Sequence, residues 1–147
     1  MKKQIAKVGD LFWVPIDDGT FVLGQVVEIK PEVLNSLTCA FYDIRVKEVT
    51  AKFSKLPNPI SIQFVTKDLF VSGMWVRSGN KKVNVSRSQL PYRNTEKNGW
   101  IGAKIIGSGI VKNFLSAFYQ LRAWDEMADS KYYENLLMPG VKPNFNA

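Results

Sequence analysis

The fold is decided by residues 11–29, which read LFWVPIDDGTFVLGQVVEI. Two runs rich in β-branched and aromatic residues, 11–16 and 21–29, flank the turn sequence Asp17-Asp18-Gly19-Thr20. An Asp-Gly step between such runs predicts a β-hairpin, because glycine tolerates the positive φ that the turn requires. Both runs are apolar at odd and even positions, which predicts a sheet that is covered on both faces.

Two residues inside these runs refine the hairpin. Pro15 has no N–H to donate to a ladder, so the first strand is expected to lie at a sheet edge or to end there. Gly24 inside the second run predicts a bulge or bend, as in small curved sheets.

More short strands are expected after the hairpin. One helical turn at 31–35 precedes a predicted strand at 37–46, and a loop with two prolines follows at 55–59. Beyond this loop the sequence predicts a further series of strands, at 60–65, 69–71, 74–77 and 82–86. The last two are expected to form a hairpin through Ser78-Gly79-Asn80, and a long polar loop follows over 90–99.

The last third of the chain changes to a helical pattern. Apolar residues recur at spacings of three and four, at Ile110, Phe114, Ala117, Phe118, Leu121 and Trp124. This spacing predicts an amphipathic helix with Ser108 as its N-cap. A second helical stretch is expected over 131–137, ended by Pro139-Gly140. We therefore predict an α+β fold, a small curved, mostly antiparallel sheet followed by C-terminal helices, in a single globular domain spanning 1–147.

Composition excludes several classes of function. The chain has no histidine and one cysteine, Cys39, which removes histidine-based catalysis, His/Cys zinc sites and an intramolecular disulfide. In its apolar run Cys39 is expected to behave as a small hydrophobic residue. No apolar run is long enough to span a bilayer, and no apolar stretch follows the basic start as in a signal peptide. A soluble cytoplasmic protein with no membrane partner is expected.

The remaining polar motifs have structural explanations. Gly107-Ser108-Gly109 lacks the spacing and the lysine of a phosphate-binding loop and is expected to be a capped turn. Asp17-Asp18 is expected to hold its turn through backbone hydrogen bonds. Asp125, Glu126 and Asp129 are expected to form a solvated face. Nothing assembles a nucleophile, a base and an oxyanion hole, so we expect no enzyme, no catalytic residue, no cofactor and no metal.

The net charge of +7 is concentrated in one part of the chain. Residues 1–107 carry all of it, and 77–104 hold seven basic residues against Glu96 alone. Such a field attracts an anionic partner, either nucleic acid or an acidic protein surface. Alternatively, the lysines line a solvated sheet edge and prevent edge-to-edge aggregation. The candidate partner-binding residues are Arg77, Lys81, Lys82, Arg87, Tyr92, Arg93 and Lys97.

Three aromatic residues, Trp75, Tyr92 and Trp100, are interleaved with these basic residues. Basic grooves with aromatic platforms bind single-stranded nucleic acid, and the same mixture of residues forms hot spots in protein interfaces. Trp75 itself is expected to lie in the core, because Val71, Met74 and Val76 surround it in the sequence.

Several short motifs resemble the immunity protein 26 family of bacteria, whose members neutralise toxins of polymorphic and contact-dependent systems. In chain order the matching stretches are Lys7-Val8-Gly9-Asp10-Leu11-Phe12, Val14-Pro15-Ile16, Asp18-Gly19, Gly24-Gln25-Val26, Ala40-Phe41-Tyr42-Asp43, Gly73-Met74-Trp75, Gly107-Ser108-Gly109-Ile110-Val111 with Phe114-Leu115, and Leu121-Arg122-Ala123-Trp124-Asp125.

The resemblance implies an antitoxin that binds a cognate toxin domain stoichiometrically and performs no catalysis. Inhibitors of nuclease toxins are expected to be acidic, whereas this chain carries +7, so its toxin is expected to present an acidic surface or not to be a basic nuclease. The charged stretch is then the expected contact surface. The alternative function is a nucleic-acid-binding β-domain that uses the basic and aromatic residues, with affinity that falls steeply as salt rises.

Overall fold

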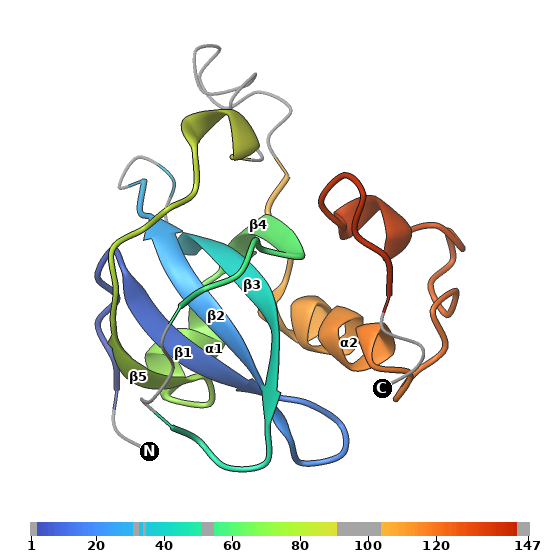
Figure 1. Ribbon diagram of the computed structural model, residues 1–147, viewed down its shortest axis with the longest axis horizontal. Helices are drawn as coiled ribbons and strands as arrows, with labels where there is room; N and C mark the ends of the chain where they lie inside the picture. Colours follow the sequence, from blue (N-terminus) through green and yellow to red (C-terminus); the bar gives the residue numbers. More distant parts are fainter. Residues whose placement is uncertain (1–2, 31–32, 34, 51–54, 91–103, 144–147) are drawn as a thin grey trace.

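The predicted hairpin lies at the centre of the sheet (Figure 1). The computed structural model describes residues 3–30, 33, 35–50, 55–90 and 104–143. Five strands form one antiparallel sheet of order β4-β3-β2-β1-β5. Their bounds are β1 Asp10–Pro15, β2 Phe21–Glu28, β3 Ser36–Val46, β4 Ser61–Thr66 and β5 Val76–Asn80. The described helices are α1 Asp68–Ser72, the 3₁₀ turn η1 Arg87–Gln89, α2 Ser108–Phe118 and the 3₁₀ turn η3 Glu134–Leu136. These strands and helices confirm the expected α+β class.

The turn between β1 and β2 has the predicted form. Gly19 adopts a φ of 83°, and Asp18 accepts a hydrogen bond from the backbone N–H of Thr20 at 3.0 Å. β1 ends at Pro15, which confirms one of the two alternatives expected for the first strand. The other, an edge position, is wrong, because β1 pairs with β2 on one side and with β5 on the other. Pro15 does not interrupt the pairing of β1 with β5, because β5 pairs only with residues 10–13 of β1.

Gly24 lies where the sheet bends, as predicted. The register between β2 and β3 shifts between Val22 and Gly24. A Cβ atom at Gly24 would lie 2.5 Å from the ring of Phe12, which is closer than real contacts allow. Phe12 in turn stacks on Trp75 with ring centroids 5.2 Å apart and nearly parallel planes. Glycine at this position therefore lets β1 and β2 curve around a packed aromatic cluster.

Both faces of the sheet are covered, as the continuous apolar runs predict. One face carries Phe12, Phe41 and Cys39, and α2 packs on it through Val111, Phe114, Leu115 and Phe118. The opposite face carries Trp13, Leu23 and Phe64 and is covered by segments without regular structure, through Leu56, Val83, Val85 and Leu90. Cys39 is fully buried, and this burial raises the pKa of its thiol. The expected role of Cys39 as a core residue is confirmed.

The strand predicted at 69–71 is wrong, because these residues belong to helix α1. Gly73 ends this helix with a φ of 87°, and the N–H of Trp75 returns to the carbonyl of Leu69 at 3.0 Å. One helical turn places Phe70 in the core beside Phe12, at a centroid distance of 5.6 Å. Tertiary packing therefore overrides the β propensity of Leu69, Phe70 and Val71.

The predicted hairpin of 74–77 with 82–86 is also wrong. β5 runs straight through the expected turn Ser78-Gly79-Asn80 and pairs with β1. Asn80 holds it there, because its side-chain amide donates to the carbonyl of Val8 and to Oδ1 of Asp10, both at 3.1 Å. The N–H of Lys81 then donates to the carbonyl of Gly9 at 3.0 Å. Residues 82–86 pair with no strand in the described part of the chain.

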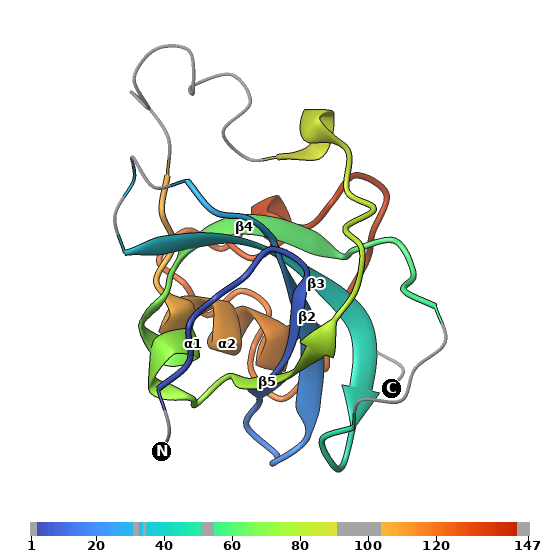
Figure 2. The same cartoon turned by 90° about the vertical axis from the view of Figure 1, so that its left-hand side faces the viewer.

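The two edge strands, β4 and β5, are shielded by other parts of the chain (Figure 2). Beside β4, Val65 forms a parallel bridge with Ile106, and the carbonyl of Ile60 accepts the N–H of Met138 at 2.8 Å. Beside β5, the side-chain oxygen of Gln4 accepts the N–H of Arg77 at 3.0 Å. Shielding of this kind prevents edge-to-edge association.

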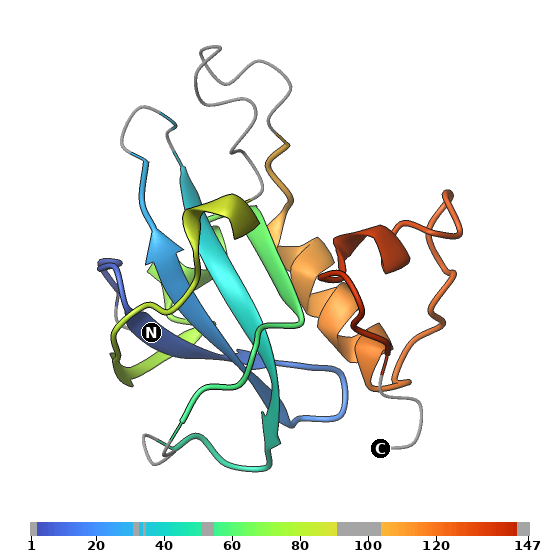
Figure 3. The same ribbon diagram turned by 45° about the horizontal axis from the view of Figure 1, so that its top comes forward.

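Helix α2 is shorter than predicted and begins differently. It ends at Phe118, not at Trp124, because Gln120 turns with a φ of 66° and the N–H of Leu121 reaches back to Ser116 at 2.9 Å. Trp124 still packs on Phe114 across the turn, at a centroid distance of 5.9 Å. The C-terminal segment thus folds back over α2 (Figures 1 and 3). Of the helix expected at 131–137, only the short η3 forms.

Ser108 is the first residue of α2 and not its N-cap, so that expectation is wrong. The capping group comes from β4: Oγ1 of Thr66 accepts the N–H of Ser108 at 2.9 Å. The Ser108 hydroxyl instead donates to Oδ1 of Asp68 at 2.7 Å. Thr66 and Asp68 therefore tie the start of α2 to the junction of β4 and α1. The expected helical turn at 31–35 and the loop over 90–99 lie largely outside the described residues.

The first prediction concerns the packing of Phe12 against Gly24. Gly24→Ala should lower the free energy of unfolding by about 1–3 kcal/mol, because the buried ring has no room to move away from the new methyl group. Urea denaturation followed by tryptophan fluorescence measures this. Gly109→Ala is the matched control, since nothing lies within 4 Å of its added Cβ, and it should not destabilise the helix. Equal stability of the two variants would contradict the close approach.

The second prediction concerns acid stability. Hydrogen bonds from Ser108 and Thr66 hold the pKa of the Asp68 carboxyl below its ordinary value of 3.8. A carboxyl group whose pKa is lower in the folded than in the unfolded chain stabilises the fold at pH values above its unfolded pKa. This stabilisation is lost as the pH falls through the folded pKa. Asp68→Asn should therefore reduce stability at pH 7 and flatten its decline below about pH 5. Thermal unfolding from pH 7 to pH 2 measures this, with the exposed Asp125→Asn as control; an unchanged slope in Asp68→Asn would contradict it.

Candidate partner-binding surface

Two of the predicted basic residues, Lys81 and Lys82, line a hollow beside the face of the sheet that α2 does not cover. Its volume is about 190 Å³, and Lys55, Leu56 and Asn84 complete its wall. An adjoining hollow of about 210 Å³ shares Lys55, Leu56 and Asn84 and extends over Pro57, Pro59 and Val85. We call the two together the lysine groove. It lies between segments 55–59 and 81–89, and no acidic residue is among the described residues that line it.

The lysine groove has one strongly basic end and one end that is lined by both polar and apolar residues. Lys55, Lys81 and Lys82 lie at the basic end. At the other end Tyr42 forms part of the floor, and its hydroxyl donates to Oε1 of Gln25 at 2.9 Å. The Tyr42 phenol is uncharged at neutral pH, and burial raises its pKa to about 12. The groove can therefore take a group that combines negative charge with apolar surface.

Lys55 is a member of this surface that the sequence does not predict. It lies in a loop that is 26 residues before Lys81 in the sequence, and the two prolines of that loop identify it only as a break between strands. The packing of Leu56, Val83 and Val85 on the same core cluster brings the two segments together. No signal in the sequence alone indicates this pairing.

Arg77 lies on β5 but serves a structural purpose. Its Nε lies 3.0 Å from Oδ1 of Asp10, a carboxylate with no exposed surface. Asp10 also accepts the N–H of Lys7 at 2.9 Å and the Asn80 amide. A buried carboxylate needs this set of partners, so the guanidinium of Arg77 is committed to the fold even though its side chain is 42% exposed.

The other predicted residues differ in how far the structure describes them. Arg87 lies in η1, but the structure does not describe its side chain. Tyr92, Arg93, Lys97 and Trp100 lie outside the described residues. Trp75 is 1% exposed in the core, as expected, and therefore offers no platform for a nucleic-acid base. Its Nε1 has no hydrogen-bond partner among the described residues, so the ring is held by its aromatic neighbours.

Of the acidic motifs, Asp18 has the role expected of it, whereas Glu126, expected on a solvated face, is paired with Arg122 and accepts the hydroxyl of Tyr133. Asp18 binds Thr20 and Arg45, which holds the turn between β1 and β2. Asp17 lies 3.3 Å from Arg122, and Arg122 also pairs with Glu126 at 2.7 Å. These contacts tie the turn to the C-terminal segment. Within the described part of the chain, no three His, Cys, Asp or Glu residues lie close enough to hold a metal ion.

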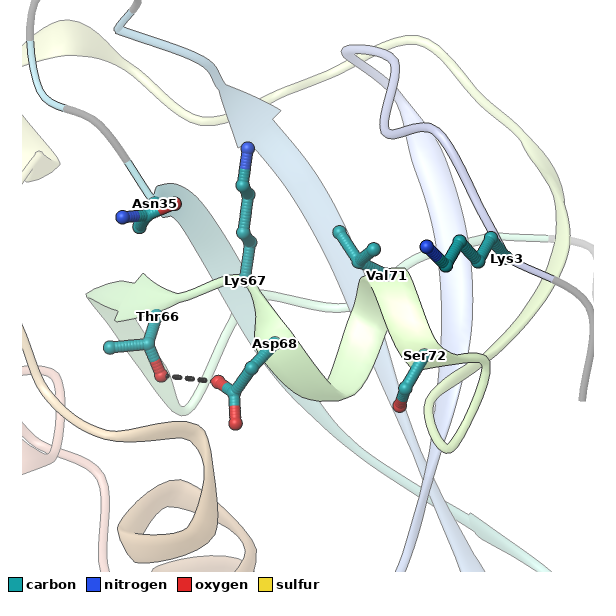
Figure 4. Close-up of a pocket in the computed structure, with 7 residues that line it drawn as sticks. All are labelled: Lys3, Asn35, Thr66, Lys67, Asp68, Val71 and Ser72. Atoms are coloured by element: carbon teal, nitrogen blue, oxygen red, sulfur yellow. Dashed lines mark hydrogen bonds between the residues drawn. The ribbon is translucent and has the colours of Figure 1, made fainter.

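A larger hollow of about 630 Å³ lies beside α1, away from the lysine groove (Figure 4). It is lined by Lys3, Asn35, Thr66, Lys67, Asp68, Val71 and Ser72. Figure 4 shows Lys67 and Asp68 pointing apart, with Asp68 turned toward Thr66. Thr66 and Asp68, two of its polar residues, are engaged in holding Ser108, and the Ser72 hydroxyl donates to the carbonyl of Leu69. We therefore take the lysine groove as the candidate surface.

The described helices do not include one with the length and apolar character that a membrane crossing requires.

Comparison with known proteins gives one match. Residues 7–100 match the family model of immunity protein 26, and this range contains all five strands, α1 and the lysine groove. No curated protein and no solved structure matched the chain. The match spans more than half of the 147 residues, and the chain therefore belongs to the immunity protein 26 family.

Proposed function

We propose that this protein is an antitoxin that binds a cognate bacterial toxin domain and neutralises it by stoichiometric contact, without catalysis. The observation that carries this proposal is the family match over residues 7–100. The toxin would belong to a polymorphic or contact-dependent system, and neutralisation would take place in the cytoplasm of the cell that carries both proteins. The whole chain, 1–147, would act as one domain.

The contact surface in this proposal is the lysine groove with its basic neighbours. A preformed, rigid scaffold supports it, because Val83 and Val85 rest on the buried face of the sheet. The described residues that line the groove include three lysines and no acidic residue, which favours an acidic toxin surface, and attraction between opposite charges speeds association. Lys81, Lys82 and Arg87 remain the contact residues expected from the sequence, with Tyr92, Arg93 and Lys97 beyond the described part, and Lys55 joins them.

The alternative, a nucleic-acid-binding β-domain, keeps the basic surface but loses one of its three aromatic residues. Trp75 is buried and is 5.2 Å from Phe12 in a stacked pair, so it cannot also stack on a base. Base stacking supplies much of the affinity for single strands. The structure therefore favours a protein partner, and binding of nucleic acid becomes an outcome of the test below.

The third prediction tests neutralisation directly. Co-expression with the C-terminal toxin domain of the protein encoded immediately upstream should restore growth, and the complex should co-elute at ~0.15 M and, with lower affinity, at ~0.5 M salt. Lys55→Glu/Lys82→Glu should abolish rescue. Lys131 and Lys142 are also exposed but lie far from Lys55 and Lys82 in the sequence. The double substitution Lys131→Glu/Lys142→Glu makes the same change in net charge and should preserve rescue. Nucleic acid that co-purifies at low salt, with no complex, would support the alternative.

The fourth prediction separates stability from binding. Arg77→Ala should lower the free energy of unfolding by about 1.5–3 kcal/mol, because Asp10 loses a charged partner while it stays buried. Lys82→Ala should change stability by less than about 0.5 kcal/mol and weaken toxin binding. Urea denaturation and calorimetric titration with the toxin domain measure the two effects. Equal stability losses in both variants would contradict the separate roles given to these residues.

A further inference from the structure

The main chain of residues 82–85 makes no hydrogen bond within the described part of the chain. This holds for their N–H groups and for their carbonyls. The residues on either side are held: Lys81 bonds to Gly9 and Gln25, and Ser86 bonds to Gln89. Backbone N–H and carbonyl groups form strong hydrogen bonds, and here they belong to a segment that lines a groove.

The segment also has the side-chain pattern of a strand. Val83 and Val85 are half-buried against the core, whereas Lys82, Asn84 and Ser86 are exposed. This alternation has the period of two that a strand shows when one face is buried. The sequence also predicts a strand at 82–86, and the structure provides no partner strand for it in the described part. In Figures 1 and 3 the segment leaves β5 and runs to η1 over the face that α2 does not cover.

The opposite wall of the groove cannot supply that partner strand. Pro57 and Pro59 are two of its five residues, and proline has no N–H to donate. Main-chain pairing in the groove must therefore come from residues 82–85, while the wall at 55–59 offers apolar surface and the ammonium group of Lys55.

A second copy of the protein is a poor occupant. Antiparallel pairing of 82–85 with itself would bring the lysines of two basic grooves together, and like charges on facing strands are destabilising. Lysine on an unpaired strand is a common protection against self-association. An acidic strand from another protein would instead be attracted to these lysines.

We propose that residues 82–85 accept an extended, acidic segment of the cognate toxin as an added β-strand, seated in the lysine groove with its carboxylates at Lys55 and Lys82. This inference rests on the proposed function and names the mode of contact. Main-chain hydrogen bonds would supply affinity, and the lysines would select for acidic side chains.

The fifth prediction uses proline substitutions, which remove one N–H each. Successive N–H groups of an extended chain point to opposite sides, so either Val83→Pro or Asn84→Pro removes a donor on the groove side. One of the two should weaken binding of the toxin domain by about tenfold or more, and the other by much less. Val83→Ala and Asn84→Ala are the side-chain controls. If Val83→Pro does not fold, Val85→Pro removes an N–H on the same side.

The outcomes separate this inference from the proposed function. If wild-type protein binds the toxin domain and neither folded proline variant is weaker than its alanine control, the added strand is refuted and the antitoxin function stands. If wild-type protein does not bind the toxin domain, both fall. A dimer of the free protein in light scattering that Asn84→Pro abolishes would also overturn the inference, in favour of pairing between copies. A tenfold loss confined to one proline variant supports it.

Discussion

The close approach of Phe12 to Gly24 is the constraint on which the rest of the structure depends. A side chain larger than hydrogen at position 24 would collide with a ring that is itself stacked on Trp75 and edge-on to Phe41 and Phe70. Because this cluster draws from β1, β2, β3, α1 and the segment before β5, it fixes how these elements meet. The bend of the sheet, the short helix α1 and the position of β5 all follow from filling this one space.

The placement of the lysine groove is a consequence of the same constraint. Once Trp75 is buried, β5 must begin directly after it and lie beside β1, where Arg77 meets the buried carboxylate of Asp10. Asn80 and Lys81 then hold the chain to Val8 and Gly9, so residues 82–85 leave the sheet in a fixed direction. Val83 and Val85 rest on the core, and the side chains of Lys82 and Asn84 stay outside. A charged surface is thus held against the core by two valines, without a regular element of its own.

Local patterns predicted the parts of this fold that local interactions determine. The hairpin of β1 and β2, the bend at Gly24 and the burial of Cys39 follow from turn chemistry and apolar runs that a few neighbouring residues contain. The errors arise where distant residues decide. Thr66 replaces Ser108 as the group that caps α2, and Asn80 prevents the turn that Ser78-Gly79-Asn80 otherwise favours. Of the candidate site, Lys81 and Lys82 were predicted from charge, whereas Lys55 requires knowledge of how two loops pack.

The central claim is that the toxin seats itself in the lysine groove, and amide hydrogen exchange of the complex tests this most directly. Binding should slow exchange at residues 82–85, whose N–H groups have no partner in the described part of the free protein. It should leave unchanged the hollow beside α1 that Lys67 and Val71 line. Protection confined to that hollow or to the C-terminal segment, with 82–85 exchanging as fast as in the free protein, would contradict the account.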